Sequence, residues 1–285
     1  MKQDIHQEVT NSIIRALEEG NVPWHKPWKG GGGGLPQRST GEHYNGINVL
    51  ILWSASMEHG FSNDHWFTYQ QAKKLGAQVT KGSKSTTVIY YSTFKKEDAT
   101  GKIETIPFMK SYRVFNADQI EGLPEKYSTP KEENTSTITP IETLETFFNS
   151  TGAIIHHGGN KAFYTPADDF IRMPERDTFH NAMGYYSTLA HECIHWTGHA
   201  KRLDRLGKFS NEKEYAFEEL VAEIGSCFLT ARLNYEPNFD QSGAYIKTWL
   251  KALKSDKRFI FKASSKASAA ANYLFEAQQE AVKAA

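Results

Sequence analysis

The sequence has few cysteines, no net charge and no long apolar segment. Its 285 residues include only 2 cysteines, so we expect no disulfide framework and interpret Cys193 and Cys227 as reduced packing residues. Lys and Arg equal Asp and Glu at 33 each, so the overall charge does not indicate a nucleic-acid partner. No segment approaches the roughly 20 apolar residues of a membrane helix, and the first residues lack a secretory pattern. We therefore expect a cytoplasmic protein without a membrane partner.

The length and the local composition predict two domains. A chain of 285 residues with 39% hydrophobic residues can form two packed cores of ordinary size. Apolar periodicity disappears over residues 124–140, where Pro, Ser, Thr and charged residues dominate, which is typical of a linker. We predict an α+β protein with a first domain at 1–123, a linker at 124–140 and a second domain at 141–285.

Apolar patterns predict the main elements. Apolar residues at every fourth position from Ile5 to Leu17 indicate an amphipathic helix that ends at Gly20. Residues 86–94 and 106–115 are rich in β-branched and aromatic residues and are separated by turn residues, which predicts a β-hairpin.

A five-residue motif in the second domain carries the clearest chemical signal. Residues 191–195 read His-Glu-x-x-His. A spacing of four places His191 and His195 on one helix face, where two imidazoles can bind a single metal ion. Glu192 lies beside that face, where it can act as a general base without ligating the metal. Such a short motif also occurs by chance on solvated helices, but the apolar stretch just before it favours a buried helix.

The third metal ligand is expected on a second helix. A metzincin requires a histidine ten residues after the first, and position 201 is Lys201, so that class is excluded. In the predicted helix at 218–225, Glu219 and Glu223 lie one turn apart on one face. We predict Glu219 as the ligand, Glu223 as the carboxylate that accepts the spare ring N–H of either histidine, and Glu218 as a surface residue. Three other carboxylates remain alternative ligands: Glu218, Glu223 and Asp204.

Cations and aromatic rings alternate in the first domain, and no acidic residue occurs from His65 to Lys96. Cations that follow phosphates and rings that stack on bases are the two parts of sequence-tolerant single-strand binding. Most rings in strands belong to the core, whereas tryptophans in a Pro- and Gly-rich segment have less regular structure to bury them. The candidate DNA-binding residues are Trp24, Trp28, Trp66, Tyr69, Lys73, Lys74, Lys81 and Lys84.

Longer motifs extend over nearly the whole chain. They are LEEGNVPW at 17–24 with KPW at 26–28, YNGIN at 44–48, WFTYQQA at 66–72, VFNADQIEGL at 114–123, YYSTLAHE at 185–192, HWTGH at 195–199, RLDR at 202–205, EELVAEI at 218–224, Tyr245-Ile246, Trp249-Leu250, Asp256 and Arg258. In these motifs the chain resembles the ArdC-type antirestriction proteins of conjugative plasmids. The run of five glycines from Gly30 to Gly34 departs from that pattern.

The resemblance implies a small mixed α/β domain that binds single-stranded DNA, followed by a zincin-like metalloprotease domain of the gluzincin type. It implies Zn²⁺ or another divalent metal as cofactor, an unknown protein substrate, and a role in protecting incoming DNA from host restriction. Two hypotheses remain open: an active zinc-dependent metalloprotease, or a protein that coats single-stranded DNA and whose zinc site is structural or vestigial. Glu192 favours the first, since a structural site needs no base beside an open coordination position.

Overall fold

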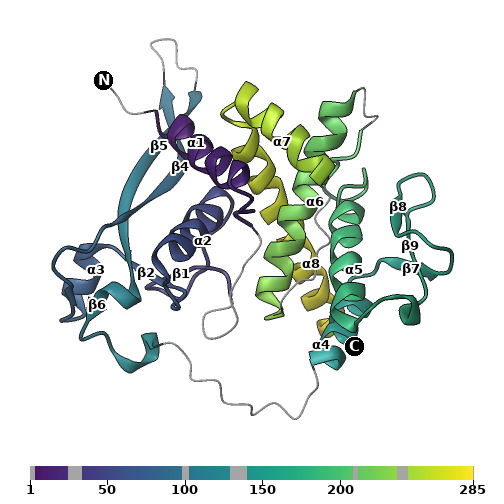
Figure 1. The fold of residues 1–285 in the computed structure, drawn as a ribbon, viewed down its shortest axis with the longest axis horizontal. Coiled ribbons are helices and arrows are strands. Elements are labelled where there is room, and N and C mark those ends of the chain that lie inside the picture. The colour runs from purple at the N-terminus through teal and green to yellow at the C-terminus, as the bar shows by residue number, and fades with distance from the viewer. Residues whose placement is uncertain are drawn as a thin grey trace. The chain divides into compact units, whose positions relative to one another are not determined.

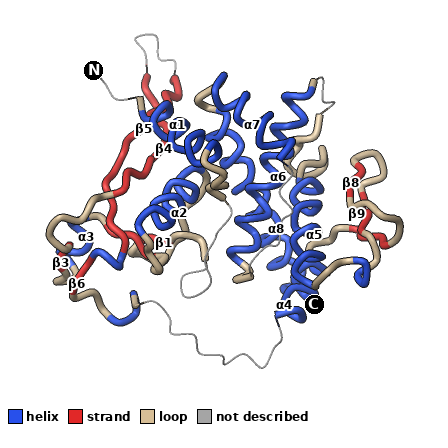
Figure 2. Tube along the Cα trace, in the orientation of Figure 1, coloured by secondary structure: helices blue, strands red, loops and turns tan. Residues whose placement is uncertain are grey.

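Two compact units form the computed structural model, which describes residues 4–24, 34–97, 103–128, 140–207, 211–235 and 243–284. The helical unit contains the described residues of Met1–Trp28, Gly33–Leu35 and Glu133–Ala285, and the sheet unit contains those of Pro36–Glu132. Figure 1 traces their elements along the chain, and Figure 2 separates helices from strands by colour. The mixture of helix and sheet confirms the predicted α+β class.

A four-stranded sheet in the order β1-β2-β5-β4 is the centre of the sheet unit. Its strands are β1 (Gln37–Arg38), β2 (His65–Phe67), β4 (Thr86–Glu97) and β5 (Ile103–Asn116). The β1–β2 pair is parallel and the other two pairs are antiparallel. Strands β4 and β5 form the predicted hairpin, with Tyr90 opposite Lys110. Residues an even number of positions from Tyr90 therefore share one face of this hairpin.

Helices and short strands complete the sheet unit. Asn48 lies on a helix that packs on β4. Its side chain donates to the carbonyl of Ile89 at 2.7 Å and accepts the N–H of Ile89 at 2.8 Å. It therefore satisfies both backbone groups of Ile89 on the outer edge of β4. A small core includes Phe67, Val79 and Tyr127. The other elements are α2 (Ile47–His59), α3 (Tyr69–Lys74), β3 (Gln78–Val79), β6 (Ile120–Glu121), and the 3₁₀ turns η1 (Ala117–Gln119) and η2 (Glu125–Tyr127).

Helices dominate the helical unit, and a three-stranded sheet in the order β7-β9-β8 packs on one of them, α5. Among the described residues, no helix has both the length and the apolar character needed to cross a bilayer. The elements are α1 (Ile5–Glu18), α4 (Pro140–Ser150), β7 (Ile154–His157), β8 (Phe163–Thr165), β9 (Phe170–Met173), the 3₁₀ turn η3 (Arg176–Thr178), α5 (Ala182–Thr197), α6 (Glu212–Arg232), α7 (Gly243–Ser255) and α8 (Phe259–Ala284).

The close approach of α5 and α6 places the histidine motif beside the acidic helix (Figure 1). A Cβ atom added to Gly225 on α6 would lie 2.9 Å from Ile194 Cγ2 on α5. Real Cβ atoms essentially never come that close to another atom. Ile194 is completely buried and directly precedes His195. The missing side chain at position 225 therefore sets the spacing of the two helices next to a motif histidine.

Helix α1 belongs to the helical unit, although the sequence-based division assigned it to the domain at 1–123. The helix itself follows the prediction: Asp4 caps its start, and Gly20 adopts a φ of 81° just after its end. Its Thr10 hydroxyl donates to the carbonyl of Lys257 at 2.8 Å, and α1 packs on α7. The three-dimensional unit is therefore discontinuous in sequence.

Candidate metal centre

Helix α5 presents the histidine motif on its last two turns. Asn181 caps the helix start by accepting the N–H of Gly184 at 2.8 Å, and the helix ends at the cap residue Gly198. Leu189 and Cys193 are buried, so the apolar side of α5 faces the core. Helix α6 starts after its own asparagine cap, Asn211. The two caps and the apolar packing fix both helices where the motif requires them.

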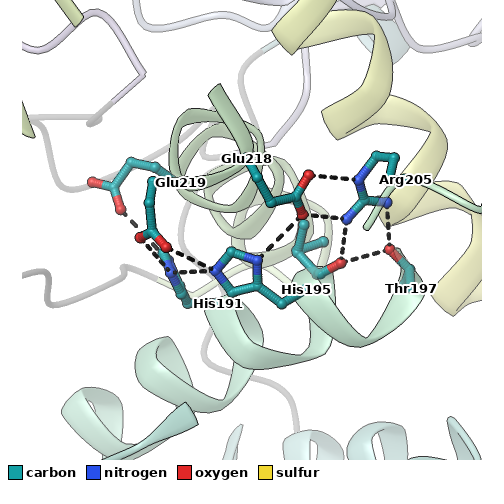
Figure 3. Close-up of polar contacts among 8 residues, drawn as sticks. His191, His195, Thr197, Arg205, Glu218 and Glu219 are labelled. Atoms are coloured by element: carbon teal, nitrogen blue, oxygen red, sulfur yellow. Dashed lines mark hydrogen bonds and ion pairs between the residues drawn. The ribbon is translucent and has the colours of Figure 1, made fainter. Parts of the chain in front are cut away.

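The predicted ligand atoms converge on one point (Figure 3). One donor atom each from His191, His195 and Glu219 lies within 4.8 Å of the other two. The two Nε2 atoms are 3.2 Å apart, and the Glu219 oxygens lie 3.7 Å from His191 Nε2 and 3.6 Å from His195 Nε2. Metal–ligand bonds of about 2.0–2.2 Å in a tetrahedral site separate two donors by roughly 3.3–3.6 Å. The donor set therefore fits a divalent metal ion.

The electrostatics of the cluster favour a cation. Burial lowers the pKa of His191, but the hydrogen bond to Glu219 and the charges of Glu192 and Glu223 outweigh burial and raise it to about 9. Burial raises the pKa of Glu219, and its contacts with the two histidines more than reverse this effect and lower it. Glu192 is itself buried and offers no atom to the donor set. This is the arrangement expected of a general base beside a metal.

Two carboxylates contact the outer nitrogens of the histidines. Glu223 Oε2 lies 3.7 Å from His191 Nδ1, which agrees in position with the orienting role predicted for Glu223. Glu218 Oε1 lies 3.2 Å from His195 Nδ1. The interpretation of Glu218 as a surface residue is wrong, because it is 4% exposed and bonded to Arg205. Helix spacing alone did not reveal this, because the contacts of Glu218 come from His195 on α5 and from Arg205 in the loop after it.

Two of the candidate DNA-binding tryptophans are corrected by their burial. Trp24 and Trp66 are each 1% exposed, so neither ring can stack on a base, and the prediction is wrong for both. Trp24 packs edge-on against Trp249, and Trp66 packs edge-on against Phe61. Trp28 lies outside the described residues. The other candidates are exposed in the sheet unit: Tyr69, Lys73, Lys74, Lys81 and Lys84.

The β4–β5 hairpin carries a row of exposed and half-exposed rings that are not among the candidate DNA-binding residues predicted from the sequence. Tyr112, Tyr90, Phe108 and Phe94 form a chain of ring contacts with centroid distances of 6.2, 6.2 and 6.0 Å. Tyr90, Phe94 and Tyr112 are 45–47% exposed. Lys110 lies over the Phe108 ring at 5.2 Å. We call these four rings the aromatic row. In the sequence, the sign of this row is the even spacing of aromatic residues in both strands. Strands of a protein core show the same spacing, so the pattern alone does not indicate exposed rings.

The fold and the donor set define a zincin-like metalloprotein with an additional N-terminal domain. Residues 142–266 match the family model described as a zincin-like metallopeptidase, and residues 3–115 match that of the N-terminal domain of anti-restriction factor ArdC. The chain belongs to the ArdC family of antirestriction proteins.

Solved structures and curated relatives agree with this assignment. The metal-free crystal structure of the antirestriction ArdC protein from the R388 plasmid is 50% identical, with 98% of this chain and 99% of that chain covered and a TM-score of 0.86. For the Mn(II)-bound structure the values are 49% identity, 97% and 98% coverage, and a TM-score of 0.83. The uncharacterized protein y4eC of Sinorhizobium fredii is 35% identical, with 98% of this chain and 94% of the relative covered.

Two longer relatives match this chain over only a small part of their own length. They are two Escherichia coli proteins, both named DNA primase TraC, with 35% and 37% identity over 99% of this chain. The chain spans 28% and 20% of their respective lengths. The likeness therefore concerns one region of these proteins and does not extend to the rest of them.

Proposed function

We propose that this ArdC-family chain is a zinc-dependent peptidase that also binds single-stranded DNA, and that it protects DNA entering a cell by conjugation from host restriction. The convergence of His191, His195 and Glu219 beside a buried Glu192 carries the enzymatic part of this proposal. The protein acts in the cytoplasm, where incoming DNA meets restriction enzymes.

The reaction is the hydrolysis of a peptide bond. A divalent ion held by the two histidines and Glu219 would supply Lewis-acid chemistry and would lower the pKa of a water molecule towards about 7. Glu192 takes a proton from the attacking water as the new C–O bond forms at the scissile carbonyl. The same carboxylic acid then returns that proton to the leaving nitrogen as the C–N bond breaks. Glu192 therefore ends the cycle in its starting state.

Zinc is the metal that we propose, and Mn²⁺ remains a competitor. Two imidazoles and one carboxylate form a set typical of catalytic zinc sites with one open position. The relative from plasmid R388 has been crystallised with Mn(II), and Zn²⁺ binds nitrogen ligands more strongly than Mn²⁺ in the ordinary order of divalent metals. Competition between the two ions for the purified protein distinguishes them directly.

The aromatic row supports single-stranded DNA as the partner of the sheet unit. Successive bases stack on exposed rings, and each such contact is worth about 1–3 kcal/mol by alanine substitution. The rings of the aromatic row follow one another at 6.0–6.2 Å on one face of the hairpin. Lys110 on the same face supplies a cation beside the rings, and the exposed lysines of the sheet unit supply further positive charge for the phosphates.

The Glu192→Gln variant tests whether proteolysis causes protection. It should keep its metal and its affinity for single-stranded DNA, because Glu192 is not a donor, and lose metal-dependent cleavage of proteins in a recipient-cell lysate. The decisive measurement is the yield of conjugation into a restricting recipient, with a non-restricting recipient as control. Loss of protection supports the protease. Full protection by Glu192→Gln instead eliminates proteolysis as the cause and leaves the coating of single-stranded DNA as the function.

A further inference from the structure

A buried ion pair lies directly behind one metal-binding histidine (Figure 3). Arg205 donates to Glu218 twice, from Nε to Oε2 at 3.1 Å and from Nη2 to Oε1 at 2.9 Å. The same Oε1 atom lies 3.2 Å from Nδ1 of His195. Guanidinium, carboxylate and imidazole therefore form a continuous series that ends at the Nε2 atom facing the metal position.

Arg205 is also fixed to the end of the histidine helix. Its Nη1 donates to the Thr197 hydroxyl at 2.9 Å, and its Nη2 donates to the carbonyl of Ile194 at 2.7 Å. The last carbonyls of a helix have no partner within it, so the guanidinium satisfies one of them. Arg205 thus ties the final turn of α5 to Glu218 on α6, the two helices that supply the metal ligands.

The loop after α5 is folded tightly enough to deliver this arginine. The N–H groups of Arg205 and Leu206 both bond to the carbonyl of Gly198, at 2.8 and 2.9 Å. Asp204 adopts a φ of 47°, a conformation that is uncommon for residues with a side chain. A Cβ atom at Gly198 would lie 2.8 Å from Leu206 Cγ and 3.0 Å from Arg205 Nη2. Position 198 therefore has no room for a side chain.

A contribution to the stability of the fold does not by itself explain the buried Arg205–Glu218 pair. A buried ion pair loses so much hydration that its replacement by apolar residues is often neutral or stabilising. The pair instead fixes the orientation of the Glu218 carboxylate. With Glu218 held by two donors from Arg205, its Oε1 stays directed at Nδ1 of His195. That nitrogen then carries the proton, and the lone pair of Nε2 remains available for a metal ion.

We propose that Arg205 is a positioning residue of the metal centre, which acts through Glu218 to fix the tautomer and the ring orientation of His195. The inference rests on the proposed function in one respect, namely that His195 binds the metal. It adds Arg205, and the close packing at Gly198 that places it, to the features on which metal affinity depends.

The experiment compares two buried arginines of the same loop. Arg202 is bonded to Asp169 and to the Trp196 carbonyl and lies over the Trp196 ring at 3.9 Å. Arg205→Met and Arg202→Met each remove a buried guanidinium that is paired with a carboxylate. A purely structural role of the two arginines therefore predicts similar effects of both variants on metal binding. We expect the Zn²⁺ dissociation constant, measured against a competing chelator in folded protein, to rise about 10–100-fold for Arg205→Met and to remain close to wild type for Arg202→Met. If the Zn²⁺ dissociation constant rises equally in both variants, the proposal is wrong.

A milder pair of variants covers the case in which Arg205→Met does not fold. Gly198→Ala crowds the Leu206 side chain, the Arg205 guanidinium and the His195 carbonyl without removing a charge, whereas Gly207→Ala adds a methyl group with nothing within 4 Å. We expect weaker Zn²⁺ binding and altered visible bands of the Co²⁺-loaded protein for Gly198→Ala alone. Identical affinities and spectra in both variants refute the inference. Failure of the wild-type protein to bind any divalent metal refutes the proposed function instead.

Discussion

Replacing Gly225 by alanine should push apart the two helices of the candidate metal centre, α5 and α6. The new Cβ atom would lie 2.9 Å from Cγ2 and 3.1 Å from Cγ1 and Cδ1 of Ile194. Favourable contacts between carbon atoms occur at about 3.5–4.0 Å, so the atoms must separate by roughly 0.6–1.1 Å. Ile194 is buried and β-branched, and its side chain has little freedom to move away. Its displacement shifts the adjacent His195.

Two opposing terms determine the stability of this variant. Alanine in place of glycine stabilises a helix interior by about 0.8–1 kcal/mol. Overpacking of a tight core costs about 1–3 kcal/mol. The net result for Gly225→Ala is a loss of up to about 2 kcal/mol. Gly184 on α5 is the matched control, because its added Cβ meets its nearest neighbours at 3.6 and 3.9 Å, which is ordinary contact. Gly184→Ala should therefore gain up to about 1 kcal/mol.

Urea denaturation of both variants, with a metal chelator present, measures these free energies of unfolding. A second titration gives the Zn²⁺ dissociation constants, which should rise for Gly225→Ala and stay unchanged for Gly184→Ala. The free energy of unfolding should fall for Gly225→Ala and rise for Gly184→Ala, so the two variants are readily distinguished. If Gly225→Ala proves as stable as Gly184→Ala and binds metal as tightly as the wild type, then the close approach at position 225 does not set the helix spacing.

Three further predictions concern the two proposed sites. Tyr90→Ser with Phe94→Ser should weaken single-stranded DNA binding in a fluorescence anisotropy titration by about 1–3 kcal/mol per ring, whereas Tyr91→Ser, on the other face of the hairpin and 65% exposed, should not. Glu219→Ala should lose most of its bound metal by elemental analysis, and full occupancy would contradict the ligand assignment. The His191 pKa of about 9 means that binding displaces a proton, so metal affinity should fall about tenfold per unit as pH drops from about 9 to about 6. An affinity independent of pH in a chelator competition would refute that displacement.

The residues of the candidate metal centre were predictable because their signal is local. His191 and His195 share a helix face through their spacing alone, and the spacing of Glu219 and Glu223 on the next helix follows the same rule. The hairpin at β4 and β5 was predictable for a similar reason, since alternating β-branched and aromatic residues with turn residues between them describe a hairpin without reference to the rest of the chain.

Burial and long-range pairing were not predictable from the same patterns. Trp24 is covered by Trp249, a residue more than 200 positions away, so its neighbours in sequence suggested exposure. Arg205 meets Glu218 only because the loop after α5 folds back on the helix end. Both features depend on tertiary packing, which the composition of a short segment does not encode.

The packing of α1 has a consequence for the order in which the protein can fold during synthesis. Thr10 bonds to a carbonyl that lies 247 residues later in the chain. At a translation rate of about 5–20 residues per second, that partner emerges roughly 12–50 s after α1. Every residue of the sheet unit leaves the ribosome within this interval. The apolar side chains of Ile13 and Leu17, buried in the finished protein, therefore wait without their final partners while the middle of the chain is being made.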